Sequence, residues 1–164
     1  MGFFFKWIAL LFFLLLSISP AFAAINTSSM VIGVDVVGDC TISATPLIFG
    51  LYNPNACTST QSTARLRVLC TLNTPYHVAL DQGAGNAATT RLRSMSGPEN
   101  SSIRYTLSQN PTHTINWGNI IGVDTKLRIG NGLQQILVVY GQIPPKQNVG
   151  IGSYRDIVNV SIIF

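Results

Sequence analysis

The sequence predicts an all-β protein, an immunoglobulin-like sandwich of antiparallel strands. Apolar and polar residues alternate in run after run, with the period of two that a strand with one buried face requires. Glycine, proline and asparagine separate these runs, as they do at turns. No segment shows the 3.6-residue apolar period of an amphipathic helix. Short alternating strands between such turns are typical of a sandwich.

The expected strands are those alternating runs, taken in order. They cover residues 30–37, 39–49, 62–72, 75–82, 102–109, 126–130, 134–143 and 153–164, with shorter pieces near 91–94 and 113–117. In the run 62–72 the even-numbered apolar side chains share one face, while Arg65 and Arg67 share the other. The run 136–140 is apolar on both faces, as in a central strand or a strand covered by a partner.

Residues 1–23 have the pattern of an export signal. Lys6 provides the positive start, residues 7–16 are apolar throughout, and Ala21-Phe22-Ala23 fits the small-x-small cleavage rule. The apolar core is shorter than the roughly 20 residues needed to span a bilayer. We therefore expect export, no stable membrane insertion after cleavage, and a mature chain from Ala24 that has the length of one domain.

The charged residues do not form a pattern that indicates a polyanionic ligand. The chain carries ten Lys and Arg against six Asp and Glu, and the basic residues, Arg93 among them, are scattered. Scattered cations are expected on solvated faces, so no nucleic-acid partner is expected.

Few residues could carry catalysis. His77 falls on the polar side of its strand and His113 lies in a turn region, which are ordinary surface positions. The acidic residues are dispersed, with no close pair of the kind that glycosidases use. Three Cys and two His at these spacings do not make a metal-ligand set. We expect no enzyme, no catalytic residue, no metal and no cofactor.

The three cysteines, Cys40, Cys57 and Cys70, allow three pairings. Export to an oxidising compartment favours one disulfide and one remaining thiol. Cys40 begins a strand, and Cys70 is in phase with the buried face of the run 62–72, so Cys40–Cys70 is the favoured pair. Cys57 lies in a loop and is left either free or paired between chains.

The first alternating run follows directly behind the export signal. Its apolar residues are Met30, Ile32, Val34 and Val36. This run can be the first strand of a self-contained sandwich, or it can be a strand donated to another copy, as in β-augmentation. Period two alone does not separate these two interpretations.

A series of different short motifs is spread along the whole chain after the export signal. In order, they are Cys40–Leu47, Phe49-Gly50, Tyr52, Val68–Thr71, Thr74–Tyr76, Arg91, Arg93, Met95, Tyr105-x-Leu107, Val139–Pro144 and Gly152–Phe164. In order and spacing the chain resembles the spore coat protein U domain family, which includes the major and minor pilins of archaic chaperone–usher pili. Cys57 departs from the family pattern, as does Gln142, where the family has Arg.

The resemblance implies that residues 39–164 form an incomplete immunoglobulin-like β-sandwich, which donor-strand exchange completes. Residues 24–38 are then the N-terminal donor strand segment, with Met30, Ile32, Val34 and Val36 as its inserted side chains. The family's disulfide corresponds to Cys40 and Cys70.

The resemblance also implies partners and a location. A periplasmic chaperone first lends a strand to the groove, and an outer-membrane usher then exchanges it for the donor strand of another pilin subunit. The implied groove and chaperone contacts on the C-terminal strand are Val158, Val160, Ile162 and Phe164, the last with its terminal carboxylate. The implied product is a secreted surface fibre that supports adhesion and biofilm formation. The alternative is a self-complemented secreted β-sandwich that acts as a coat or binding protein.

Overall fold

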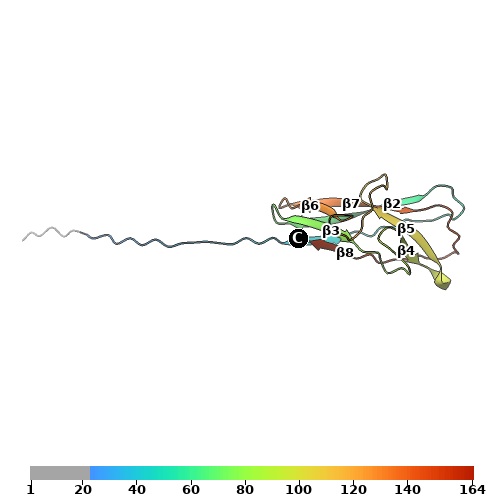
Figure 1. Ribbon diagram of the computed structural model, residues 1–164, viewed down its shortest axis with the longest axis horizontal. Coiled ribbons are helices and arrows are strands. Elements are labelled where there is room, and N and C mark those ends of the chain that lie inside the picture. Colours follow the sequence, from blue (N-terminus) through green and yellow to red (C-terminus); the bar gives the residue numbers. More distant parts are fainter. Residues whose placement is uncertain (1–22) are drawn as a thin grey trace, which may run out of the picture. The chain divides into compact units, whose positions relative to one another are not determined.

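The computed structural model describes residues 23–164, so the predicted export signal lies, except for its last residue, outside the described residues (Figure 1). The chain divides into two units, Met1–Asp35 and Val36–Phe164. The described part of the first unit, residues 23–35, forms no helix or strand, and its side chains are exposed. The second unit carries the fold.

Eight strands and one short 3₁₀ helix make up the second unit (Figure 1). They are β1 (Cys40–Ala44), β2 (Thr60–Cys70), β3 (Pro75–Leu80), β4 (Arg93–Ser96), η1 (Pro98–Asn100), β5 (Ser102–Ser108), β6 (Lys126–Ile129), β7 (Gln134–Ile143) and β8 (Val160–Ile163). Every strand pair is antiparallel. The prediction of an all-β, immunoglobulin-like sandwich is confirmed.

The larger sheet has the order β1-β2-β7-β5-β4. Its longest pairing joins β2 to β7, with Ala64 opposite Val139 and Leu66 opposite Leu137. These four side chains are buried, while their neighbours along β2 are exposed, because alternate residues of a strand point to opposite faces. The register therefore places the apolar side of both strands on the core.

The smaller sheet has the order β6-β3-β8. Val78 of β3 lies opposite Ile162 and Leu80 lies opposite Val160, so the C-terminal strand contributes its even-numbered residues to the core. Trp117 is fully buried, and its indole N–H donates a hydrogen bond of 2.9 Å to the carbonyl oxygen of Val78. This bond satisfies the one polar atom of that side chain.

Several expected strands differ from the observed ones. The range 134–143 is observed as expected, but 39–49 shortens to β1 and 153–164 shortens to β8. Residues 30–37 and 113–117 form no strand, and the piece near 91–94 is observed as β4. A strand needs a hydrogen-bonded neighbour, and the shortened parts of β1 and β8 adjoin the groove described below.

Arg93 was expected on a solvated face, and this expectation is wrong. Its side chain is fully buried. The guanidinium donates to the backbone carbonyl oxygens of Asp81 (2.8 Å), Leu80 (3.1 Å) and Trp117 (2.9 Å), and also to that of Thr90 (2.7 Å). These four backbone acceptors compensate for the hydration that the guanidinium loses on burial. Alternation along the sequence does not reveal such acceptors.

No helix within residues 23–164 has the length and apolar character that crossing a membrane would need.

A candidate strand-binding groove

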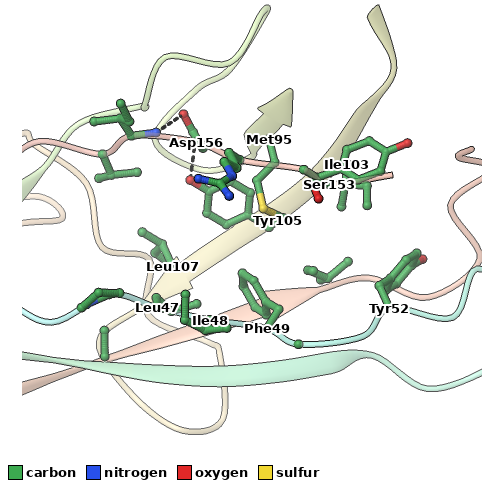
Figure 2. A pocket seen from close by; sticks show the side chains of 18 of the residues that line it. Leu47, Ile48, Phe49, Tyr52, Met95, Ile103, Tyr105, Leu107, Ser153 and Asp156 are labelled. Atoms are coloured by element: carbon green, nitrogen blue, oxygen red, sulfur yellow. Dashed lines mark hydrogen bonds between the residues drawn. The ribbon is translucent and has the colours of Figure 1, made fainter. Parts of the chain in front are cut away.

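An elongated apolar groove of about 1140 Å³ runs along the second unit between two chain segments, 44–52 and 149–160. Figure 2 shows Leu47, Phe49 and Tyr52 along one wall and Ser153 and Asp156 along the other. Its volume exceeds the roughly 300–1,000 Å³ of small-molecule pockets. An elongated shape between two extended segments suits a stretch of polypeptide better than a compact ligand.

The two walls of the groove adjoin the free edges of β1 and β8, and apart from Ala44 and Val160 they lie outside any strand. The C-terminal wall is tied to β4 at one point, where Arg155 and Ser96 form a bridge. Among the described strands, β1 pairs with β2 alone and β8 pairs with β3 alone. No backbone hydrogen bond joins the described segments 44–52 and 149–160 across the groove. Unpaired N–H and C=O groups on facing edges are a template for an added strand.

The floor of the groove is apolar. It is formed by side chains of β2, β3, β4, β5 and β7, namely Leu66, Leu80, Met95, Ile103, Tyr105, Leu107, Val139 and Ile143. Phe49 lies over this floor and packs against Tyr105 edge to face, with ring centroids 6.1 Å apart. Any segment that fills the groove would therefore place one side of itself on the hydrophobic core.

The C-terminal wall is held by the carboxylate of Asp156. Its Oδ2 accepts a hydrogen bond of 2.6 Å from the Tyr105 hydroxyl, and its Oδ1 accepts 2.8 Å bonds from the backbone N–H groups of Ala84 and Ile157. Burial, with the hydrogen bond and charge of Asp156, raises the pKa of the Tyr105 phenol. Tyr105 therefore stays protonated and remains a donor.

A second carboxylate, that of Asp81, holds the same wall nearer to β8. It accepts hydrogen bonds from the backbone N–H of Asn159 (2.9 Å) and from its side-chain amide (2.6 Å). The backbone carbonyl of Asp81 is one of the acceptors of buried Arg93. Burial lowers the pKa of the Arg93 guanidinium, and the negative charges of the nearby carboxylates oppose this effect.

The outer rims of the groove are apolar as well. Ile48 and Leu51 on one rim, and Ile151 and Ile157 on the other, are largely exposed although they line the groove. Exposed apolar residues grouped around a hollow mark a binding surface.

The predicted site residues lie in three places. Val158 and Val160 line the groove. Ile162 is half buried in β8, outside the lining, and Phe164 is exposed. The predicted donor residues, Met30, Ile32, Val34 and Val36, are all exposed and outside any strand.

Sequence reasoning missed most of the groove. Leu47 and Phe49 do not continue the alternation of β1, whose core-facing residues are Cys40 and Ile42. The phase shifts by one residue near Thr45, so extending the alternation would have pointed to Ile48, which is exposed. The partnership of Tyr105 with Asp156 joins residues 51 positions apart, and no sequence signal indicates it.

One disulfide joins Cys40 to Cys70, directly opposite each other on β1 and β2. Cys57 is a free, exposed thiol. Within the described residues, no group of His, Cys, Asp and Glu could hold a metal ion.

The fold and the groove define a class of protein. A sandwich whose two sheets leave facing edges unpaired above an apolar floor is a strand-accepting immunoglobulin-like domain. Residues 26–161 match the model of the Spore Coat Protein U domain, and the chain belongs to this family. The predicted family is therefore confirmed, and family and fold together are those of a pilin-like structural subunit.

Similar proteins agree with this assignment. The chain is 34% identical to Protein U of Myxococcus xanthus over 164 residues, which cover 92% of this chain and 91% of the relative. Among solved structures it is similar to the CsuC–CsuE chaperone–tip adhesion subunit pre-assembly complex from archaic chaperone–usher Csu pili of Acinetobacter baumannii. The TM-score is 0.56 at 25% identity, covering 79% of this chain but only 40% of that one.

A weaker similarity is to the Hda pilus minor tip subunit HdaB of E. coli. The TM-score is 0.38 at 17% identity, covering 76% of this chain and 80% of that chain.

Proposed function

We propose that this protein is a structural pilin subunit of a secreted chaperone–usher type pilus. Residues 30–36 of one subunit fill the groove of the next, and the resulting surface fibre supports adhesion and biofilm formation. The observation that carries the proposal is the apolar groove whose two walls adjoin the unpaired edges of β1 and β8. The role is structural, without catalysis.

The division of the chain follows from this role. Residues 1–23 are the export signal, 24–38 the donor strand segment and 39–164 the pilin domain. A periplasmic chaperone and an outer-membrane usher handle the subunit before it joins other pilin subunits. The similarity to a chaperone–subunit pre-assembly complex supports the chaperone. Exposed Phe164 is the proposed chaperone grip.

The length of the donor run fits the groove. At about 3.3 Å per residue, Met30 to Val36 extends over roughly 20 Å, and the wall from Ala44 to Tyr52 over roughly 26 Å. Four alternating apolar side chains, at about 1.5–3 kcal/mol each, would contribute on the order of 6–12 kcal/mol before ordering costs. The exposure of these side chains in the single chain leaves them available.

The position of the run along the chain disfavours self-complementation. The tightest hairpin into β1 would use Gly38-Asp39 as a two-residue turn, which places Val37 opposite Cys40. In that register the groove wall 44–52 faces residues 25–33. Longer turns move the apolar run still further from the groove.

Such a hairpin would bring the wrong side chains into the groove. Asn26 and Ser28 would face the core, where unpaired polar groups are costly. Val34 and Val36 would lie opposite residues 43 and 41 of β1, outside the groove wall that begins at Ala44. This mismatch favours a donor from another copy over a self-closed coat or binding protein.

The direct test is Val34→Asp. A carboxylate in the apolar groove should abolish fibre formation, assayed by electron microscopy and by loss of heat-resistant multimers on gels, while the chaperone complex still forms. The matched control is Gly33→Asp, because Gly33 is on the opposite phase and an added Cβ there meets no atom within 4 Å. Fibres from the Val34→Asp chain would refute the donor assignment.

Deletion of residues 24–38 tests the alternative. A pilin without its donor should depend on the chaperone as much as the full chain does, because its groove is equally empty. A self-complemented sandwich should lose stability and become dependent on a chaperone only after the deletion. Periplasmic yields with and without the chaperone separate these outcomes.

A further inference from the structure

Gly141 has an unusual position in β7. It is on the buried phase of the strand, between Val139 and Ile143, and two side chains from the facing groove wall lie where its side chain would be. A Cβ at residue 141 would be 2.8 Å from Cζ of Phe49 and 2.9 Å from Cδ1 of Leu47. Because Gly141 has no side chain, Leu47 and Phe49 can pack close to the backbone of β7.

An added methyl group would displace these two side chains rather than the sheet. The close atoms are the far ends of side chains, whereas the backbone of β7 is fixed by its pairing with β2 and β5. Phe49 already contacts the ring of Tyr105, which limits its sideways movement. Leu47 and Phe49 both line the groove, so upward displacement makes the groove shallower.

The affected place is the middle of the groove. Leu47 and Phe49 flank the midpoint of the wall segment 44–52. Of the four apolar donor residues, the middle ones face this point whichever way the donor strand runs. These residues are Ile32 and Val34.

We propose that Gly141 is a specificity-determining residue that sets the depth of the central groove, and so the size of the donor side chain accepted there. This inference rests on the proposed function, since it concerns the same groove and the same occupant. A donor with β-branched residues at its centre would be accepted because residue 141 has no side chain.

The test measures donor peptide binding to the full chain carrying Val34→Asp, which blocks its own donor and leaves its groove free. The probes are a peptide of residues 24–38 and four versions of it, with Ala at Met30, Ile32, Val34 or Val36. The acceptors are this chain, the same chain with Gly141→Ala, and the same chain with Gly150→Ala. Gly150 also lines the groove, but an added Cβ there meets no atom within 4 Å.

Gly141→Ala should weaken binding of the unmodified peptide about tenfold, which corresponds to roughly 1.4 kcal/mol. The loss should shrink for the peptide with Ala at residue 32 or 34, and persist for Ala at 30 or 36, because only contacting groups couple. Gly150→Ala should bind all five peptides like the reference. An equal loss for every peptide, or no loss, would overturn the inference.

A second variant tests the inference in case Gly141→Ala does not fold. Leu47→Ala enlarges the same place without crowding β7, so it should bind a peptide with Val34→Phe or Ile32→Phe relatively better than the reference does. An unchanged size preference would also overturn the inference. If no peptide binds even the reference acceptor, the proposed function itself fails. This result differs from one in which the peptides bind but Gly141→Ala affects them all equally, which would overturn only the inference about Gly141.

Discussion

The hydroxyl of Tyr105 donates a hydrogen bond of 2.6 Å to Oδ2 of Asp156. Tyr105 belongs to β5 on the groove floor, and Asp156 belongs to the C-terminal wall. Because Asp156 also accepts from the backbone of Ala84, one carboxylate connects the wall to two parts of the domain. The wall is thereby held in place without an occupant in the groove.

Tyr105→Phe should lower the free energy of unfolding by about 1.5–3 kcal/mol at neutral pH, the usual contribution of a hydrogen bond to a charged group. The natural chain should also lose stability as the pH rises above about 10, the ordinary pKa of tyrosine. There the unfolded chain ionises at residue 105, while the folded chain, whose Tyr105 pKa is raised, does not. Urea unfolding from pH 7 to pH 11 measures both effects.

The alkaline decline should be smaller in Tyr105→Phe, though not absent, because burial also raises the pKa of Tyr76. Tyr140→Phe is the control at neutral pH, since no hydrogen bond of its hydroxyl occurs within the described residues, and it should change stability by less than about 0.5 kcal/mol. An alkaline decline that is identical with and without Tyr105 would contradict the assignment.

Arg93→Met should destabilise the domain by about 3–5 kcal/mol, the range for breaking a buried charged network. The change leaves four buried carbonyl oxygens without their donor. Arg91→Met is the matched control, because Arg91 is exposed and two residues away, and it should be nearly neutral. Thermal unfolding midpoints of both variants check the prediction, and equal midpoints would contradict it.

Removal of the disulfide by replacing Cys40 and Cys70 with Ala should lower stability by about 3–4 kcal/mol, because the bridge closes a loop between residues 30 positions apart. Cys57→Ala is the control, since that thiol is free and exposed. The comparison of urea midpoints under oxidising conditions measures the difference. If the two replacements shifted the midpoint equally, the stabilising role of the bridge would be refuted.

Local alternation predicted the strands that are paired on both sides. The run 134–143 is observed with the expected bounds because β7 lies inside its sheet and its whole length is paired. The alternation of 62–72 likewise identified the buried face of β2. Alternation overestimated β1 and β8, because an alternating sequence can lie along an edge where no neighbour completes the ladder.

The polar parts of the site could not be predicted in this way. Arg93 finds acceptors at residues 80, 81, 90 and 117, which only the fold brings together. Gly141 leaves room for Leu47 and Phe49, which belong to the wall segment 44–52 and pack against it. Both cases depend on long-range packing, for which a single sequence carries no periodic signal.

Asn26 and Ser28 should keep the chain from closing its own groove. If Asn26 and Ser28 are what exclude the chain's own segment from its groove, replacing both with Val should allow self-closure. The alternating apolar run would then begin at residue 26 and would match the wall 44–52 through the Gly38-Asp39 turn. Since closure within one chain does not depend on concentration, a heat-resistant monomer should appear and persist on dilution.

Thr27→Val with Ser29→Val is the matched control for that double variant, because it adds the same apolar area on the opposite phase, which faces outward in the same hairpin. Size-exclusion chromatography with light scattering after serial dilution would compare the monomer fractions. A monomer fraction as low as that of the control would mean that something other than side-chain register keeps the segment out. The short connection of Val37 to Asp39 would then be the remaining physical cause, since at about 3.3 Å per residue it leaves little freedom to turn.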